Sequence, residues 1–245
     1  MYMETGIKYP RRRFIRGLFR VLITTALGVL SNVAIEGAEN LQEGGPLLVV
    51  ANHFHFLDPV VLIRATKWPL EFVGGAQTPN APKALSWLTG AYGFIPTYRG
   101  TGSRMTLKAS QSILAQKGVL AIFPEGGSWA TLLRPARPGT AFLATQMDTK
   151  ILPIGIDGVV DFFHQISSGK RPSIHVRIGK SFGPFVKADP TRPSREELET
   201  IGETIMRAIA ELIPPERRGY FSTDPLVREA AKGTEFYPWQ NHPEG

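Results

Sequence analysis

Three short apolar runs, each followed by polar or turn-forming residues, constrain the fold of this chain most. They cover residues 46–51, 119–123 and 151–156, and each is short for a helix. Such runs are typical of strands buried on both faces of a sheet. Two further strands are expected at 70–74 and 174–179, and segments with helical spacing lie between the strands. We therefore expect one α/β domain with a mostly parallel or mixed central sheet flanked by helices.

The length of 245 residues suits one such domain with a sizeable core. We place the α/β domain at residues 36–213, after an N-terminal segment 1–35. The polar, proline-containing tail 214–245 is expected to be extended or partly disordered. The chain has no cysteine, which excludes disulfides, cysteine nucleophiles and cysteine-based metal sites.

The N-terminal segment has the pattern of an amphipathic helix. Apolar residues recur at helical spacing from Phe14 to Val33, and Arg13, Arg16 and Arg20 fall on the other face. A basic amphipathic helix of this kind is expected to lie in a membrane interface. The apolar part, 21–30, is short for a bilayer span. A secretory signal or single span, and an ordinary packed helix, remain as alternatives.

The net charge of +7 and the pI of about 9.8 suit three kinds of acidic partner. These are an anionic bilayer, an acidic carrier protein and nucleic acid. The cations concentrate beside apolar residues rather than along a polar groove, and no nucleic-acid-binding motif is recognised. We therefore expect a membrane lipid surface as partner and no nucleic acid.

The first strand leads into the sequence Asn52-His53-Phe54-His55-Phe56-Leu57-Asp58. His53 thus lies where a strand ends and a helix begins, the edge at which open α/β sheets bind ligands. A histidine there can remove the proton of a substrate hydroxyl, and a carboxylate such as Asp58 can orient its ring. The alternative is that Asp58, which precedes Pro59, caps the helix. His55 alternates with His53, so we expect it to pack or hydrogen-bond rather than share a metal.

Two more segments are candidates for binding. Arg99 precedes a helix expected to begin near Ser103, and a guanidinium beside free helical N–H groups favours phosphate. The alternative is a solvated surface arginine. Residues 124–128 follow the second apolar run, and the glycines there allow backbone N–H groups to approach a ligand or oxyanion closely. A plain turn is the alternative.

Four motifs in one order resemble the 1-acyl-glycerol-3-phosphate acyltransferase family. The family's blocks are Asn-His-x4-Asp, Gly-x-Ile-x3-Arg, Phe-Pro-Glu-Gly and an apolar strand with a central proline. The resemblance spans about residues 45–185, and four blocks in register are far more specific than one. The matching positions are Asn52-His53…Asp58, Gly93…Arg99, Phe123-Pro124-Glu125-Gly126 and Leu152-Pro153-Ile154.

This resemblance implies transfer of a fatty acyl group from an acyl-CoA or acyl-carrier-protein thioester to a lysophospholipid hydroxyl. With 1-acyl-glycerol-3-phosphate as acceptor, the product is phosphatidic acid, a step of phospholipid biosynthesis. It implies His53 as base, Asp58 as its orienter and Arg99 as holder of the acceptor phosphate. Glu125 and the adjoining glycines, Gly126 and Gly127, are implied to shape the acceptor site. No cofactor or metal is expected, and the expected location is the cytoplasmic face of the cell membrane.

The chain departs from the family after its third block. The block usually continues Thr-Arg-Ser, but here it continues Gly127-Ser128-Trp129. Arg134 or Arg137 is a candidate substitute for the missing arginine. The departure leaves another lysolipid or a glycolipid open as acceptor. A non-catalytic lipid-binding protein on the same fold is a further alternative. A serine hydrolase is not supported, because the chain contains no Gly-x-Ser-x-Gly elbow.

Overall fold

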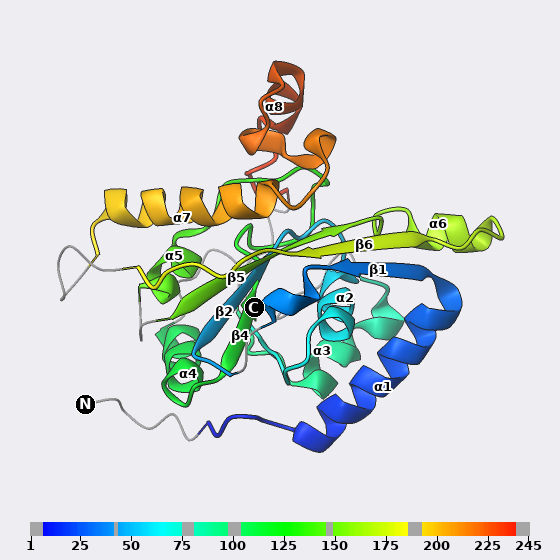
Figure 1. Cartoon of the computed structure of the whole chain (residues 1–245), viewed down its shortest axis with the longest axis horizontal. Coiled ribbons are helices and arrows are strands. Elements are labelled where there is room, and N and C mark those ends of the chain that lie inside the picture. The colour runs from blue at the N-terminus through cyan, green and yellow to red at the C-terminus, as the bar shows by residue number, and fades with distance from the viewer. Residues whose placement is uncertain are drawn as a thin grey trace.

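A computed structural model describes residues 7–41, 44–74, 81–97, 104–145, 149–185 and 193–238. Six strands form one central sheet with both parallel and antiparallel pairs. Figure 1 shows helices on both faces of this sheet, which confirms the expected single α/β domain with a mixed sheet. The strands are β1 (Asn32–Glu36), β2 (Leu47–Ala51), β3 (Glu71–Phe72), β4 (Val119–Ile122), β5 (Lys150–Asp157) and β6 (Ser173–Ile178). The helices are α1 (Arg13–Leu30), α2 (Asp58–Ala65), α3 (Trp87–Tyr92), α4 (Arg104–Ala115), α5 (Pro138–Ala144), α6 (Phe162–Ser167), α7 (Arg195–Ala210) and α8 (Pro225–Ala231).

The strand order β1-β6-β5-β2-β4-β3 makes β2 a central strand. It pairs in parallel with β4 on one side and with β5 on the other. From β2 the chain moves to β3 at one edge, whereas from β4 it crosses to β5 on the other side of β2. The carboxyl ends of β2 and β4 therefore meet at a switch point of the sheet, where ligands bind in such folds.

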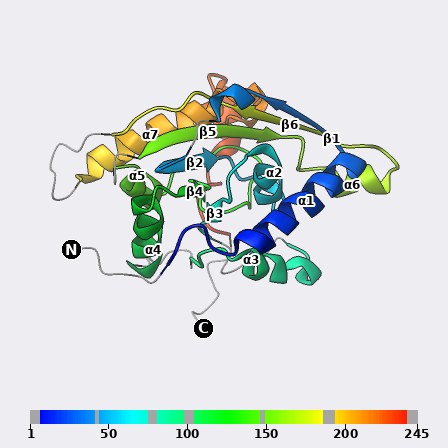
Figure 2. The same ribbon diagram turned by 60° about the horizontal axis from the view of Figure 1, so that its bottom comes forward.

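Side chains alternate between two cores on the two faces of the sheet. In β2, Leu47 and Val49 join the core beneath α1, α2, α3 and α6, while Leu48 and Val50 join the core beneath α4, α5 and α7. Figure 2 shows these two helical layers on either side of the sheet. Helix α7 begins with a capping box, in which the Ser194 side chain accepts from the Glu197 N–H and the Glu197 carboxylate accepts from the Ser194 N–H.

Two expectations about the chain ends are corrected. The helical spacing was extended to Val33, but α1 ends at Leu30 and Asn32–Glu36 forms the edge strand β1 beside β6. Along β1, Val33 and Ile35 are half-buried while the alternate residues are exposed, a period of two. In the tail, the described part contains two short 3-10 turns and α8 rather than extended chain.

Helix α1 packs with its arginine side toward the domain. Arg16 is 2% exposed, and its guanidinium donates to both carboxylate oxygens of the buried Glu71, at 2.5 and 2.7 Å. Arg11, just before the helix, donates to the same carboxylate. Arg20 donates to the carbonyl groups of Thr66 and Trp68 at the end of α2. Arg16 and Arg20 thus lie opposite the apolar side, as the spacing predicts, but they face the domain, whereas Arg13 is exposed.

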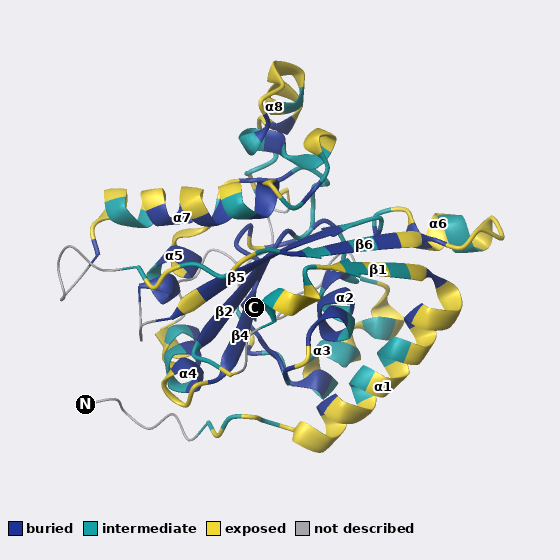
Figure 3. Ribbon diagram, in the orientation of Figure 1, coloured by how far each residue is buried: buried dark blue, intermediate teal, exposed yellow. Residues whose placement is uncertain are grey.

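The opposite side of α1 is apolar and exposed, as the yellow outer face of this helix in Figure 3 shows. The exposed fractions of Phe14, Leu18, Val21, Leu22 and Val29 are 87, 52, 61, 58 and 69%. Among the residues that the structure describes, every helix is too short or too polar to cross a membrane.

Candidate active site

The site begins where β2 ends, and Asn52 fixes that end. Its side chain donates to the Ile156 carbonyl and accepts from the Ile156 N–H, both at 2.8 Å. Asn52 is fully buried, and these two bonds continue the β2–β5 pairing one residue beyond the strand. The next residue, His53, therefore leaves the sheet from a fixed position.

Asp58 holds both the backbone of this turn and the His53 ring. Its Oδ2 lies 2.9 Å from His53 Nδ1 and accepts the N–H groups of Phe54 and His55 at 2.8 and 2.7 Å. Helix α2 begins at Asp58 itself, so the carboxylate turns back to the loop instead of capping the helix. Asp58 therefore does not cap α2; it holds the turn that precedes the helix.

This arrangement gives the His53 ring a defined orientation. A carboxylate on Nδ1 favours the tautomer with its proton on Nδ1, which leaves Nε2 free to accept one. The ring stacks on Phe123 of the next strand end, with centroids 4.1 Å apart. The His53 side chain is 14% exposed, whereas Asp58 is 1% exposed. The pair thus has the geometry of a general base with a buried orienting group.

Glu125 comes to the same edge from the end of β4 and lies beneath the His53 turn. One carboxylate oxygen, Oε1, accepts the His53 N–H at 2.7 Å. The other, Oε2, accepts the Arg134 Nε–H at 3.0 Å and the Arg134 backbone N–H at 3.2 Å. Burial raises the pKa of Glu125 to about 7, while the charge of Arg134 and these hydrogen bonds act in the opposite direction.

The glycines after Glu125 form a tight turn. Gly126 adopts a left-handed backbone with φ of +82° and is exposed, and its N–H donates to the Phe123 carbonyl. The Gly127 carbonyl points inward and accepts from Arg134. The structure thus places the predicted binding residues Glu125, Gly126 and Gly127 beside His53. Arg99 lies outside the described residues, so its role stays a prediction.

Arg134 and Arg137, the candidate substitutes for the missing arginine, both have partners within the protein. Arg134 is 1% exposed and bound to Glu125, and its guanidinium lies 3.9 Å from the centre of the Trp129 ring. Arg137 is exposed and donates to the Glu235 carbonyl at 2.8 Å. The sequence gives no indication that Asn52 and Arg134 hold the His53 turn in place. Their partners are distant in the chain or lie across an irregular loop, so periodicity gives no signal for them.

His55 packs as expected. Its ring contacts those of Phe56 and Phe163, with centroids 4.4 and 6.1 Å away. Burial lowers the pKa of the His55 imidazole. His55 thus belongs to an aromatic cluster beside the turn, on the side of α6.

A groove of about 1030 Å³ lies elsewhere, between α5, α7 and the turn Gly219–Phe221. Its described lining contains none of the predicted site residues and no histidine. Since acyl transfer to a hydroxyl needs a base, we place the candidate site by the chemistry at His53 and not by the size of the groove.

A model of the acyltransferase family matches residues 32–157, which contain Asn52, His53, Asp58 and Glu125. The chain belongs to the acyltransferase family. The 1-acyl-sn-glycerophosphate (LPA) acyltransferase PlsC from Thermotoga maritima has a similar crystal structure, with a TM-score of 0.58 and 21% sequence identity. The match covers 84% of this acyltransferase and 84% of that chain, so the shared fold extends well beyond the catalytic turn.

Proposed function

We propose that this acyltransferase moves a fatty acyl group from a thioester to the free hydroxyl of a lysophospholipid. The acceptor we propose is 1-acyl-glycerol-3-phosphate, with acyl-CoA or acyl-carrier protein as donor and phosphatidic acid as product. The observation that carries the proposal is the His53 Nδ1–Asp58 Oδ2 contact of 2.9 Å at the edge of the sheet. The order of the four motifs and the matching family model support it.

The geometry suggests the following reaction. His53 Nε2 takes the proton of the acceptor hydroxyl as its oxygen attacks the thioester carbonyl. Asp58 stabilises the resulting imidazolium through Nδ1. The tetrahedral intermediate collapses with cleavage of the carbon–sulfur bond, and the thiolate leaves and receives the proton from Nε2. The products are an ester and a free thiol.

A second acceptor class has a specific observation in its favour. Gly127, Ser128 and Trp129 stand where the family usually has Thr-Arg-Ser, so a serine replaces the arginine. Arg134 is turned inward to Glu125. We therefore keep another lysolipid or a glycolipid as the alternative acceptor. Arg99 is the residue we propose for a phosphate-bearing headgroup.

We propose that the enzyme works at a membrane surface, on the cytoplasmic face where acyl thioesters are made. The support is the apolar side of α1, with Phe14 and Leu18 exposed. Trp87, at the start of the neighbouring α3, is 61% exposed. Apolar and aromatic side chains on a helix face of this kind favour the boundary between headgroups and acyl chains.

His53→Ala in the purified full-length protein tests the reaction. We expect the transfer rate to fall by roughly 10²–10⁴, because positioned proton transfer contributes that much. The assay offers a panel of lysolipids and glycolipids with both donor types and reads the products by mass spectrometry. His164→Gln on α6 is the matched control, since His164 is exposed. Unchanged transfer by folded His53→Ala would show that His53 is not the base.

A further inference from the structure

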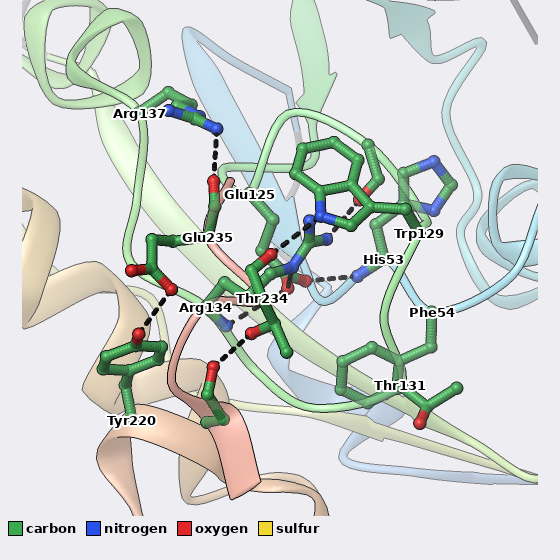
Figure 4. Close-up of polar contacts among 12 residues, drawn as sticks. His53, Phe54, Glu125, Trp129, Thr131, Arg134, Arg137, Tyr220, Thr234 and Glu235 are labelled. Atoms are coloured by element: carbon green, nitrogen blue, oxygen red, sulfur yellow. Dashed lines mark hydrogen bonds and ion pairs between the residues drawn. The ribbon is translucent and has the colours of Figure 1, made fainter. Parts of the chain in front are cut away.

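The segment after α8 returns to the loop that follows Glu125. The indole N–H of Trp129 donates to the Thr234 carbonyl at 2.7 Å, and the Tyr237 ring meets the Trp129 ring edge-on, with centroids 5.4 Å apart. Glu235 accepts from Arg137 through its carbonyl and from Tyr220 through its carboxylate. Figure 4 shows the hydrogen bonds from Trp129 to Thr234 and from Arg137 and Tyr220 to Glu235.

Arg134 lies between this aromatic contact and the catalytic turn. Trp129 covers its guanidinium at 3.9 Å, and Glu125 and the Gly127 carbonyl accept its N–H groups. Glu125 in turn accepts the His53 N–H at 2.7 Å. A continuous series of contacts therefore joins Thr234, Trp129, Arg134, Glu125 and His53, as Figure 4 shows.

We propose that Arg134 is a positioning residue for His53, acting through Glu125, and that Trp129, held by the C-terminal segment at Thr234 and Tyr237, keeps Arg134 in place. This inference rests on the proposed function, in which His53 is the base. Neither Arg134 nor Trp129 belongs to the four motifs, so the proposal goes beyond the residues that the family resemblance implies.

Electrostatics explain why Glu125 needs Arg134. Glu125 is 1% exposed, and an ionised carboxylate buried this deeply persists only with a counter-charge and hydrogen bonds. The groups that face it are the Arg134 guanidinium and the backbone N–H groups of His53 and Arg134, with the His53 ring and Asp58 beyond them. Without Arg134 the carboxylate takes a proton at higher pH, and its bond to the His53 N–H loses its charge assistance.

The shape of arginine matters as well as its charge. Nε binds Glu125 while Nη2 binds the Gly127 carbonyl, and the flat face stacks on Trp129. A lysine ammonium cannot form this fork and stack together. A small displacement of a catalytic group is costly, since about 1 Å can change a rate by roughly 10²-fold.

The experiment compares Arg134→Met and Arg134→Lys in the full-length protein with Arg195→Gln. Arg195 forms an exposed ion pair with Glu199 on α7 and serves as control for the loss of an arginine–glutamate pair. For Arg134→Met we expect kcat to fall by roughly 10²-fold with both KM values within about twofold. The acidic limb of the profile of kcat against pH should move to higher pH, because without Arg134 the Glu125 carboxyl keeps its proton up to a higher pH. Arg134→Lys should recover part of the rate.

The Trp129 variants provide a second test that leaves the Glu125–Arg134 pair intact. Trp129→Phe keeps an aromatic face over Arg134 but loses the N–H bond to Thr234, whereas Trp129→Leu loses both. Since cation–π contacts contribute about 0.5–2 kcal/mol, we expect kcat to fall more in Trp129→Leu, by about tenfold. If Arg134→Met does not fold, the two Trp129 variants test the proposal instead. A kcat equal to that of the wild type in both would overturn it.

Two results with folded Arg134→Met would also overturn it. One is an unchanged kcat and pH profile. The other is a rise in acceptor KM alone, which would make Arg134 an acceptor contact. The NMR signal of the His53 ring separates this inference from the proposed function. If the wild type transfers no acyl group to any acceptor, the proposed function fails. Movement of that signal in Arg134→Met but not Arg195→Gln still supports positioning, and an unmoved signal refutes it.

Discussion

Two buried carboxylates in this acyltransferase bind arginines but serve different parts of the molecule. The Glu71 carboxylate accepts hydrogen bonds from Arg16 and Arg11. These bonds hold α1 against the edge strand β3. Glu125 divides its oxygens between Arg134 and the backbone of His53. Both carboxylates are at most 1% exposed. The same chemical pair therefore fixes a whole helix in one place and the backbone of His53 in the other.

This comparison predicts that breaking the two ion pairs has different effects on the protein. Loss of the Glu71 pair should change stability and the seating of α1 while the rate of folded enzyme persists. Loss of the Glu125 pair should change the rate in a protein that remains folded and bound to membranes.

The largest effect is expected for Glu71→Gln. Removing one partner of a buried ion pair leaves an uncompensated charge, here on Arg16, and costs about 3–5 kcal/mol. We therefore expect the free energy of unfolding, measured by urea denaturation, to fall by about that amount. Glu199→Gln, which breaks the exposed pair with Arg195, should leave the free energy of unfolding almost unchanged. A loss as small for Glu71 as for Glu199 would contradict the anchoring role.

Glu125→Gln should lower kcat by roughly 10²-fold, equivalent to about 2.7 kcal/mol, because the amide cannot supply a charged acceptor to the His53 turn. Liposome binding should not change. An unchanged kcat in the folded variant would remove Glu125 from the positioning scheme.

The same variant tests the pKa of Glu125 through stability. The folded pKa of about 7 lies above the ordinary value of 4.5. The stabilisation from its proton is therefore complete below about pH 4.5 and is lost as pH rises through about 7. The unfolding free energy of the wild type should thus fall relative to Glu125→Gln between pH 5 and pH 8, measured by urea denaturation. A constant difference would contradict the raised pKa.

The contrast also shows what the sequence can and cannot reveal. The strands β2, β4 and β5 were predictable because their apolar runs are local, and His53 with Asp58 because they lie five residues apart in one turn. The partners Glu125 and His53, or Glu71 and Arg16, are 72 and 55 residues apart. Only the order of strands in the sheet brings them together.

Helical periodicity has a related limit, which α1 illustrates. The spacing correctly separates an arginine side from an apolar side, but it does not say which side faces the domain. That choice depends on Glu71, which lies on β3 and pairs with Arg16. Strand β1 was missed because Val33 continues the helical spacing of α1, although Asn32–Glu36 alternates with a period of two.

The smallest effect concerns the exposed side of α1. Since Arg16 and Arg20 face inward, membrane binding should depend on apolar contacts more than on charge. We expect Leu18→Ser with Leu22→Ser to weaken binding to neutral phosphatidylcholine vesicles by about tenfold, or about 1.4 kcal/mol. Vesicle co-sedimentation at low and high salt measures this binding, and salt should have little influence on it.

The control for this surface is Leu226→Ser on α8, which removes a leucine that is even more exposed, at 79%, from another part of the chain. It should leave vesicle binding unchanged. An equal loss of vesicle binding in both variants would show that the position of an exposed leucine does not matter, which would contradict a specific membrane-binding role for α1. Binding that requires anionic lipid and disappears at high salt would instead point to exposed cations such as Arg13 of α1.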